Sequence, residues 1–289
     1  MASADPDRPE MTPEEFRLLR ELVYAHSGIL VRDDLKFVME RRLWPRLEAL
    51  GLAGYAAYYQ YLRYDEGRAA ELEASVEALA THETYFFREP LQLEAFAGEL
   101  LPLLHVRNGR QKRLRLWSAG CSSGEEAYTL AMLVQDARLF DGWDVEVLGT
   151  DLSRRVLAAA RRAEYGPSAL RAAPPEALSR HFDPAGPGRF RVKDGVRAAV
   201  AFGHLNLLDP NQGQLVPRMD AIFCRNVMIY FDLAARKRAL KLFHDTLVDG
   251  GYLLLGHSES LINVTADFEL VHLKTDLVYR RPTRRGGEP

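Results

Sequence analysis

An apolar run that ends in small residues and leads into a helical pattern is the densest chemical signal in the sequence. Residues 114–128 read Leu-Arg-Leu-Trp-Ser-Ala-Gly-Cys-Ser-Ser-Gly-Glu-Glu-Ala-Tyr, with Gly120 and Gly124 at the turn. Ligands of open α/β sheets bind beyond the carboxyl ends of strands, where glycine lets the backbone come close to them. The Gly-x-x-x-Gly spacing matches neither the dinucleotide fingerprint nor the phosphate-binding P-loop. The segment predicts a nucleotide-like ligand, although a glycine turn alone does not establish one.

A carboxylate follows the next apolar run at Asp151, directly after Gly149 and Thr150. Parallel strands end at one edge of a sheet, so Asp151 should lie beside the glycine turn. A carboxylate there can accept two hydrogen bonds from ribose hydroxyls. The alternative is a helix N-cap for the residues from Ser153 onward, a role that serine or asparagine fills equally well. We favour the ribose role because of the glycine turn upstream.

Two further segments contain residue types that suit a binding site. Residues 224–232, Cys-Arg-Asn-Val-Met-Ile-Tyr-Phe-Asp, follow a later apolar run, so their polar groups should reach the same sheet edge. Residues 81–90 contain an aromatic triplet that Arg88 follows at once. A fixed cation beside buried rings can hold a planar or anionic group. The alternative for this second segment is aromatic packing at a domain junction with a solvated arginine.

The elements that position these residues follow from the pattern after about residue 80. Short apolar runs alternate there with longer helical patterns, as in β-α units with a mostly parallel sheet. We predict a terminal antiparallel hairpin at 268–280, helices at 124–139, 153–165 and 233–248, and strands at 114–119, 145–150, 200–205, 220–224 and 252–255.

A stretch between about residues 174 and 204 interrupts this alternation. It contains the Pro/Gly-rich piece 183–188 and then two short β-like runs around Asp194-Gly195. An Asp-Gly pair between such runs predicts a hairpin. Both a surface excursion and a partner-binding subdomain fit the pattern.

The N-terminal portion is predicted to be all helical. Thr12, Pro13 and Glu15 form a capping box that starts a helix, and Gly28 can end it. A second helix should begin near Asp33, and Pro45 should kink or break it. Two more helices are predicted at about residues 54–64 and 66–80.

Basic residues gather in the second of these helices. Within eleven residues a single acid, Glu40, stands against four cations: Lys36, Arg41, Arg42 and Arg46. Such a surface can steer and dock acidic helices of a partner protein. The alternative is a solvated helix face.

Composition excludes several classes of protein. The chain has 289 residues, 47% hydrophobic and 27% charged, as in ordinary globular proteins, and its net charge of -2 argues against a general affinity for nucleic acid. Cys121 and Cys224 have no Cys-x-x-Cys partner, so neither a disulfide framework nor a metal site is indicated. Because no stretch approaches the ~18 apolar residues of a membrane span, we expect a cytoplasmic chain without direct membrane insertion.

Taken together, the segments resemble one known family, the chemotaxis receptor methyltransferases named CheR. The matching pieces occur in family order at residues 82–88, 118–126, 150–151, 204–207, 223–231 and 250–260. The resemblance implies an N-terminal helical domain, residues 1–80, for receptor recognition. It also implies an α/β, Rossmann-like S-adenosylmethionine-dependent methyltransferase domain, residues 81–289, with a small antiparallel β-subdomain inserted at about 174–204.

The family pattern also implies site residues. Arg88 and Tyr230 would lie near the methyl group and orient the incoming carboxylate. Glu126 could exchange roles with Glu125. Position 82 is a histidine where the family usually has asparagine, and this His82 would make cofactor binding pH-sensitive. The implied cofactor-binding residues are His82, Thr84, Arg88, Gly120, Glu125, Asp151, Asn206, Leu207, Arg225 and Asn226.

The implied reaction transfers a methyl group from S-adenosylmethionine to glutamate side chains of methyl-accepting chemotaxis receptors and leaves S-adenosylhomocysteine. Glutamate has a reference pKa of about 4.3, so the nucleophile is already ionised and needs neither a general base nor a metal. The implied partners are the cytoplasmic domains of these receptors, and we expect the enzyme to be a monomer. Two other hypotheses stay open: a methyltransferase for a different acidic substrate, and a CheR-like cofactor-binding module that regulates a partner.

Overall fold

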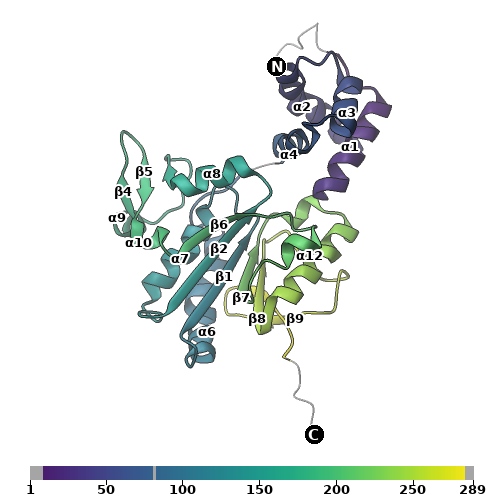
Figure 1. Cartoon of the computed structure of the whole chain (residues 1–289). Helices are drawn as coiled ribbons and strands as arrows, with labels where there is room; N and C mark the ends of the chain where they lie inside the picture. Colours follow the sequence, from purple (N-terminus) through teal and green to yellow (C-terminus); the bar gives the residue numbers. More distant parts are fainter. Residues whose placement is uncertain (1–8, 81–82, 284–289) are drawn as a thin grey trace. The chain divides into compact units, whose positions relative to one another are not determined.

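The computed structural model describes residues 9–80 and 83–283, which form two compact units (Figure 1). The first unit consists of the N-terminal helices together with residues 230–235 of the later chain. The second unit contains the remaining described residues. Among the helices that the structure describes, none is long and apolar enough to cross a membrane.

The described part of the first unit contains four complete α-helices: α1 (Pro13–Ser27), α2 (Lys36–Leu50), α3 (Tyr55–Tyr64) and α4 (Arg68–Leu79). The predicted capping box is confirmed, because the Thr12 hydroxyl accepts the Glu15 N–H and the Glu15 carboxylate accepts the Thr12 N–H. Gly28 ends α1 with a left-handed φ of 73°. Residues 230–235 join this unit through the Leu30 N–H, which donates to the Tyr230 carbonyl at 2.9 Å.

Of the two effects predicted for Pro45, a kink or a break of the second helix, the break does not occur. A short 3₁₀ turn, η1 (Asp33–Leu35), leads into α2, which then continues through Pro45 to Leu50. A proline inside a helix costs about 3 kcal/mol through the lost hydrogen bond and the ring clash. Pro45 lies on the exposed side, while Met39, Leu43 and Leu47 are fully buried on the other side of the helix. Burial of this apolar stripe offsets the local cost.

The second unit contains a seven-stranded sheet in the order β6-β2-β1-β7-β8-β10-β9 (Figure 1). Five strands run parallel: β6 (Val200–His204), β2 (Asp144–Asp151), β1 (Arg113–Ala119), β7 (Met219–Cys224) and β8 (Leu247–Leu255). The predicted terminal hairpin forms the antiparallel strands β9 (Glu269–His272) and β10 (Leu277–Arg280). The chain leaves β1 toward β2 on one side and returns to β7 on the other, so the strand order reverses between β1 and β7. This Rossmann-like topology places a ligand site beyond the carboxyl ends of those two strands.

Helices bury both faces of the sheet, as parallel strands require. On one side of β1, Leu114 and Leu116 belong to a cluster that includes Phe96. On the other side Trp117 packs edge-on against Phe243, with ring centres 5.5 Å apart. The helices of this unit are α5 (Pro90–Ala95), the π-helical η2 (Phe96–Leu100), α6 (Leu101–Asn108), α7 (Glu125–Ala137), α8 (Arg154–Arg162), α9 (Pro175–His181), α10 (Asp194–Arg197), α11 (Pro210–Gly213), the 3₁₀ turn η3 (Met228–Tyr230) and α12 (Leu233–Thr246), of which η3 and α12 share residues with the first unit.

A second, three-stranded antiparallel sheet has the order β3 (Glu164–Tyr165), β5 (Phe190–Val192), β4 (Phe182–Pro184). The hairpin predicted at Asp194-Gly195 is wrong, since these residues begin the short helix α10. The turn lies instead in the Pro/Gly-rich piece, where the Ala185 N–H donates to the Arg189 carbonyl at 2.9 Å. The positive φ angles that a tight turn needs occur there, at Gly186 and Gly188, and not at Gly195.

The small sheet is part of the main core of this unit. Phe86 is fully buried and meets the rings of Tyr165 and Phe182 edge-on, at 4.8 and 5.0 Å between centres. Its N–H also donates to the Ala169 carbonyl at 2.9 Å. The middle ring of the aromatic triplet is therefore a core residue, whereas Tyr85 and Phe87 on either side of it are half-buried. This packing also fixes the backbone two residues before Arg88.

Candidate active site

The carboxyl end of β2 is tied to the turn that follows β1. Asp151 accepts the Ser122 N–H at 2.9 Å with one oxygen and the Ser153 N–H at 2.9 Å with the other. The N–H groups of residues 120 and 121 both donate to the Thr150 carbonyl at 2.8 Å. Ser153 is the N-cap of α8 and accepts the Val156 N–H through its own hydroxyl. The Asp151 carboxylate is thus held at the strand end beside the glycine turn, as predicted.

Gly120 is required for a reason that the sequence did not reveal. Its φ is 84°, and a Cβ placed on it would lie 2.4 Å from a methyl carbon of Val227. The missing side chain therefore lets the loop after β7 approach the turn after β1. Gly124, with φ 94°, is restricted in the same way by the ring of Phe202.

A half-buried carboxylate, that of Glu259, binds the backbone of the loop after β7. Glu259 accepts the backbone N–H groups of Asn226 at 2.8 Å, Val227 at 3.1 Å, Ile229 at 3.2 Å and Gly256 at 2.8 Å. Burial raises the pKa of the Glu259 carboxyl above its ordinary value, although these N–H donors act in the opposite direction. Sequence reasoning had placed Glu259 within the matching piece 250–260 without giving it a role.

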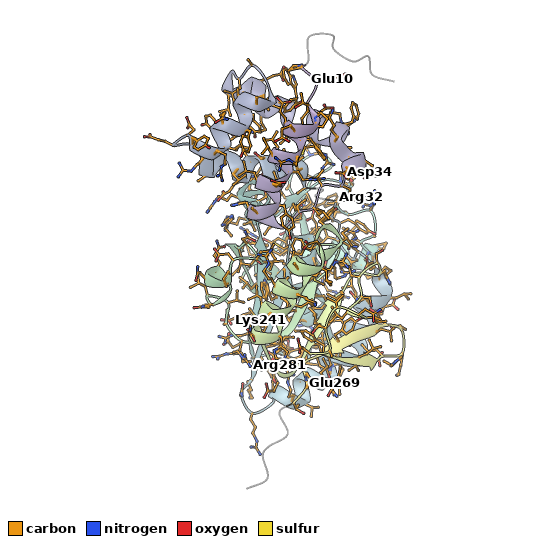
Figure 2. All side chains as sticks on the ribbon, turned by 90° about the vertical axis from the view of Figure 1, so that its right-hand side faces the viewer. Glu10, Arg32, Asp34, Lys241, Glu269 and Arg281 are labelled. Carbon is orange, nitrogen blue, oxygen red and sulfur yellow. The ribbon has the colours of Figure 1, made fainter. Side chains whose placement is uncertain are left out.

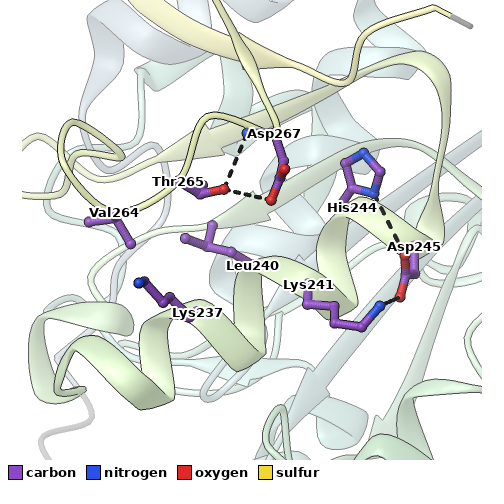
Figure 3. Close-up of a pocket in the computed structure, with 8 residues that line it drawn as sticks. All are labelled: Lys237, Leu240, Lys241, His244, Asp245, Val264, Thr265 and Asp267. Carbon is purple, nitrogen blue, oxygen red and sulfur yellow. Dashed lines mark hydrogen bonds and ion pairs between the residues drawn. The ribbon is translucent and has the colours of Figure 1, made fainter.

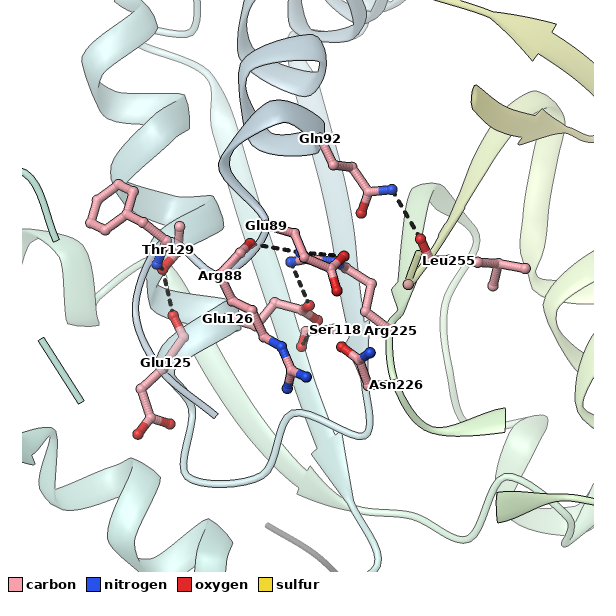
Figure 4. A network of polar contacts seen from close by, with 12 residues as sticks. Arg88, Glu89, Gln92, Ser118, Glu125, Glu126, Thr129, Arg225, Asn226 and Leu255 are labelled. Atoms are coloured by element: carbon pink, nitrogen blue, oxygen red, sulfur yellow. Dashed lines mark hydrogen bonds and ion pairs between the residues drawn. The ribbon is translucent and has the colours of Figure 1, made fainter. Parts of the chain in front are cut away.

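Arg225 lies at the centre of a buried ion network (Figure 4). Its guanidinium contacts the carboxylates of Glu89 at 3.0 Å and Glu126 at 3.2 Å, and it donates to the Arg88 carbonyl at 2.6 Å. Glu126 in turn accepts the Ser118 hydroxyl at 2.7 Å. Only 2% of the Arg225 side chain is exposed, so both carboxylates compensate a charge that water does not reach. The network joins the loop after β7 to the residues around Arg88 and to β1.

The two adjacent glutamates at the start of α7 have different surroundings. Glu126 is a member of the Arg225 network, whereas Glu125 accepts the Ser123 hydroxyl at 2.8 and 3.0 Å. In Figure 4 the Glu125 carboxylate points away from the network. Burial raises the pKa of the Glu125 carboxyl above its ordinary value, and the Ser123 hydrogen bond opposes this rise.

Two arginines, Arg88 and the distant Arg171, lie over the ring of Tyr85. The guanidinium carbon of Arg171 is 3.7 Å from the centre of the Tyr85 ring, and that of Arg88 is 5.7 Å from it. Arg88 also donates to the Glu83 carbonyl at 2.7 Å, and Arg171 pairs with the Glu83 carboxylate at 3.2 Å. No sequence pattern indicates a role for Arg171, because it lies in an irregular segment more than eighty residues after Glu83 and Tyr85.

The donor set at this edge fits S-adenosylmethionine. Among the described residues, the buried atoms that lack a hydrogen-bond partner include Ser122 Oγ, Arg225 Nε and Asn226 Oδ1. Buried polar atoms are normally satisfied, so unsatisfied ones gathered at one sheet edge indicate a ligand that completes them. S-adenosylmethionine has the ribose hydroxyls, adenine nitrogens, ammonium and carboxylate that such atoms can bind. All three belong to the turn after β1 or the loop after β7.

The remaining predicted site residues occupy several positions. Asn206 follows β6, and its side-chain oxygen accepts the Leu208 N–H at 2.9 Å. Thr84 and Leu207 are half-buried, and His82 lies outside the described residues. Tyr230 falls in the part of the chain that belongs to the first unit.

Three of the four predicted docking cations on α2 have partners within the first unit. Lys36 pairs with Glu40 at 2.8 Å, and Arg46 binds both oxygens of the buried Glu71, at 3.0 and 2.5 Å. Arg42 donates to the carbonyls of residues 79 and 80. Other surface charges of this unit are paired as well, as Arg32 is with residue 34 at 2.7 Å (Figure 2). Arg41 is exposed and has no partner among the described residues.

A separate hollow of about 580 Å³ lies along α12 (Figure 3). Two of its basic side chains, Lys241 and His244, contact the carboxylate of Asp245, at 2.7 and 3.6 Å. None of the predicted site residues lines this hollow. Its lining residues are Lys237, Leu240, Lys241, His244, Asp245, Val264, Thr265 and Asp267.

Comparison with known families decides what this sheet edge is. The model of the CheR methyltransferase SAM-binding domain matches residues 82–277, and that of the CheR methyltransferase all-alpha domain matches residues 14–80. The chain belongs to the CheR methyltransferase family. The relative named chemotaxis protein methyltransferase 1 from Pseudomonas aeruginosa is 37% identical over 273 residues, or 92% of this chain and 97% of that protein. Chemotaxis protein methyltransferase 2 from Vibrio cholerae is 32% identical over 273 residues, or 94% of each.

Membership of the CheR family confirms three predictions made from the sequence. The chain is a methyltransferase, its cofactor is S-adenosylmethionine, and the Rossmann-like domain binds that cofactor. The hypothesis of a binding module without enzymatic activity is therefore not needed.

Proposed function

We propose that this CheR-family enzyme methylates glutamate carboxylates on the cytoplasmic domains of chemotaxis receptors. The observation on which this depends is the gathering of buried, unsatisfied polar atoms beside Arg88 at the carboxyl ends of β1 and β7. The names of its relatives, chemotaxis protein methyltransferases, support a substrate among the proteins of chemotaxis. Such receptors present their glutamates in the cytoplasm, so the enzyme would act there, as a monomer.

The side chains at the carboxyl ends of the strands bind the cofactor or hold the loops around it. Asp151 and Glu125 bind the nucleoside and amino-acid parts of the cofactor through hydrogen bonds to their carboxylates, and Asn226 contributes its unsatisfied amide oxygen. The other cofactor contacts come from Thr84, Asn206, Leu207 and the backbone at Gly120. Arg225 contributes its unsatisfied Nε to the cofactor site, and its pairs with Glu126 of α7 and with Glu89 before α5 hold the loop after β7 in place.

In this proposal the enzyme accelerates the reaction by positioning the methyl group and the incoming carboxylate. Bound S-adenosylmethionine supplies a methyl group to a carboxylate oxygen and leaves as the neutral thioether S-adenosylhomocysteine. Arg88 and Tyr230 orient the incoming carboxylate, which is ionised at neutral pH and needs no base. Fixing reactants in this way is worth ~7–11 kcal/mol in well-oriented intramolecular reactions.

Receptor docking is assigned to the first unit, chiefly to Arg41. Of the four cations predicted for this role, it is the one whose charge no neighbour compensates within the described residues. Lys36, Arg42 and Arg46 shape the same surface while binding their own unit.

The proposal is tested with cofactor labelled in its methyl group and with receptor cytoplasmic fragments that carry glutamate or glutamine at the candidate sites. We expect label only on the glutamate fragments, and base treatment should release it as methanol because the product is an ester. Equal labelling of both fragments, or label that resists base, would contradict methylation of a carboxylate.

A further inference from the structure

Arg171 is held at the edge of the site by residues of the segment 83–88. Its guanidinium carbon lies 3.7 Å from the centre of the Tyr85 ring, and one nitrogen donates to the Ser168 carbonyl at 2.8 Å. The segment that contains Arg171 is itself fixed, because the Phe86 N–H donates to the Ala169 carbonyl at 2.9 Å. The guanidinium is therefore pre-oriented before any ligand arrives.

The ion pair that Arg171 makes within the chain is easily exchanged. Its partner Glu83 is 3.2 Å away, and 41% of the Arg171 side chain and 70% of the Glu83 side chain are exposed. Exposed pairs of this kind contribute little, because water and salt screen both charges. A carboxylate from another molecule can replace Glu83 without leaving a buried charge unpaired.

Arg171 and Arg88 form a pair of cations on one aromatic support. Arg88 lies 5.7 Å from the centre of the same Tyr85 ring and is tied to the Glu83 backbone at 2.7 Å. Arginine suits this position, since a guanidinium held over a ring keeps N–H donors in its own plane for a carboxylate. The two arginines thus offer two neighbouring anion sites beside Tyr85.

We propose that Arg171 is a substrate-binding residue, which receives an acidic side chain of the receptor next to the glutamate that is methylated. This inference rests on the proposed function, which places the reacting carboxylate at Arg88. The receptor surface around a methylation site would then need a second acid within reach of Arg171. The same carboxylate chemistry also occurs in the cofactor, and the experiment separates these two sources.

The test compares Arg171→Ala and Arg171→Lys with the wild-type enzyme on receptor fragments. For Arg171→Ala we expect the KM for the receptor to rise about tenfold, with kcat at saturating receptor within about twofold and an unchanged Kd for S-adenosylhomocysteine. Arg171→Lys keeps the charge but not the planar fork, so it should recover part of the loss. Higher ionic strength should reduce the difference between wild type and Arg171→Ala.

Two control variants separate substrate binding from a structural role. Glu83→Gln removes the internal competitor, so it should leave the receptor KM unchanged or lower it, whereas a purely structural pair would lose as much as Arg171→Ala does. Arg113→Ala removes an arginine of similar exposure, 49%, which begins β1 and pairs with Asp144 at the start of β2. This second control should change neither the KM for the receptor nor the Kd for S-adenosylhomocysteine.

Three outcomes would overturn the inference. A raised Kd for S-adenosylhomocysteine with an unchanged receptor KM would assign Arg171 to the cofactor carboxylate. Equal damage from Glu83→Gln and Arg171→Ala would assign it to the fold. An unchanged receptor KM in Arg171→Ala, measured on fragments that the wild type does methylate at glutamate, would refute the inference while leaving the proposed function intact.

Discussion

The Glu259 carboxylate and the Asn226 backbone meet at 2.8 Å, and this hydrogen bond joins the segment after β8 to the loop after β7. Asn226 has a positive φ of 60°, which is uncommon for a residue other than glycine. The N–H groups of Val227 and Ile229 donate to the same carboxylate, so Glu259 stabilises the conformation of that loop. The unsatisfied oxygen of Asn226 is therefore held at the site by Glu259.

We expect Glu259→Gln to weaken cofactor binding. A glutamine has the same size, but one of its two terminal atoms is an N–H donor that faces N–H groups of the loop. The Kd for S-adenosylhomocysteine should rise at least about tenfold, as calorimetry would show. The matched control is Glu269→Gln, which changes an exposed carboxylate that pairs with Arg280. It should leave the Kd for S-adenosylhomocysteine unchanged. Equal Kd values for wild type and Glu259→Gln would contradict the positioning role.

Glu125 should make the stability of the enzyme depend on pH. Burial raises the pKa of its carboxyl, and a carboxyl with a raised folded pKa stabilises the fold in its protonated form. That contribution is complete below the unfolded pKa of about 4.3 and is lost as the pH rises through the folded value. The free energy of unfolding of Glu125→Gln, relative to wild type, should therefore increase from about pH 4.3 toward neutrality. Urea unfolding over this range would show it, and a relative stability that falls with pH would contradict it.

Removal of Arg225 should destabilise the second unit. Arg225→Ala leaves Glu89 and Glu126 with little exposure and without their cation, and breaking a buried pair from one side costs about 3–5 kcal/mol. The double variant Arg225→Ala with Glu126→Gln should recover part of this loss, because one of the two uncompensated charges is gone. Denaturant unfolding measures the free energies of both variants. Strict additivity of the two changes would mean that the groups do not interact.

Asp151 and Tyr230 should affect different kinetic constants. Asp151→Ala removes the acceptor of the Ser122 N–H and of the proposed ribose hydroxyls, so the Kd for the cofactor should rise at least about tenfold. Tyr230→Phe should mainly lower kcat, since its hydroxyl is assigned to the incoming carboxylate. Calorimetry and steady-state kinetics on both variants would reveal an exchanged pattern, which would overturn these assignments.

Arg41 and Arg46 form a matched pair on one helix. Arg41→Ala should raise the KM for the receptor several-fold without changing the melting temperature, because the side chain is exposed and no described neighbour pairs with it. Arg46→Ala should instead lower the melting temperature, since it leaves the buried carboxylate of Glu71 without its cation. Thermal melts and receptor titrations distinguish the two. A melting temperature that falls only for Arg41→Ala would reverse the roles.

Local patterns sufficed to predict most elements of the fold. The capping box at Thr12, the stop at Gly28 and the strands on either side of Gly120 were read correctly because each depends on neighbouring residues. The two errors arose where distant packing or turn geometry decides the outcome. Burial of one side of α2 overrides Pro45, and positive φ angles place the hairpin turn near Gly186 instead of Gly195.

The candidate site was predictable in its location but not in its internal contacts. Strand order places Asp151 and the loop after β7 at one edge, which the sequence could indicate. The contact of Glu126 with Arg225, and those of Glu259 with the loop after β7, join residues 30 to 99 positions apart. Arg171 was missed for the same reason. No local periodicity or motif in the sequence indicates contacts between residues so far apart.

The participation of residues 230–235 in the N-terminal unit has a practical consequence for dissecting the enzyme. A fragment that ends after α4 lacks the acceptor of the Leu30 N–H and the carboxylate of Asp232 that Tyr24 binds at 2.7 Å. The polypeptide passes from the larger unit into the smaller one and back again, so one protease cut before residue 83 cannot liberate an intact helical module. Recombinant receptor-recognition fragments should therefore be grafted with the 230–235 peptide instead of simply truncated.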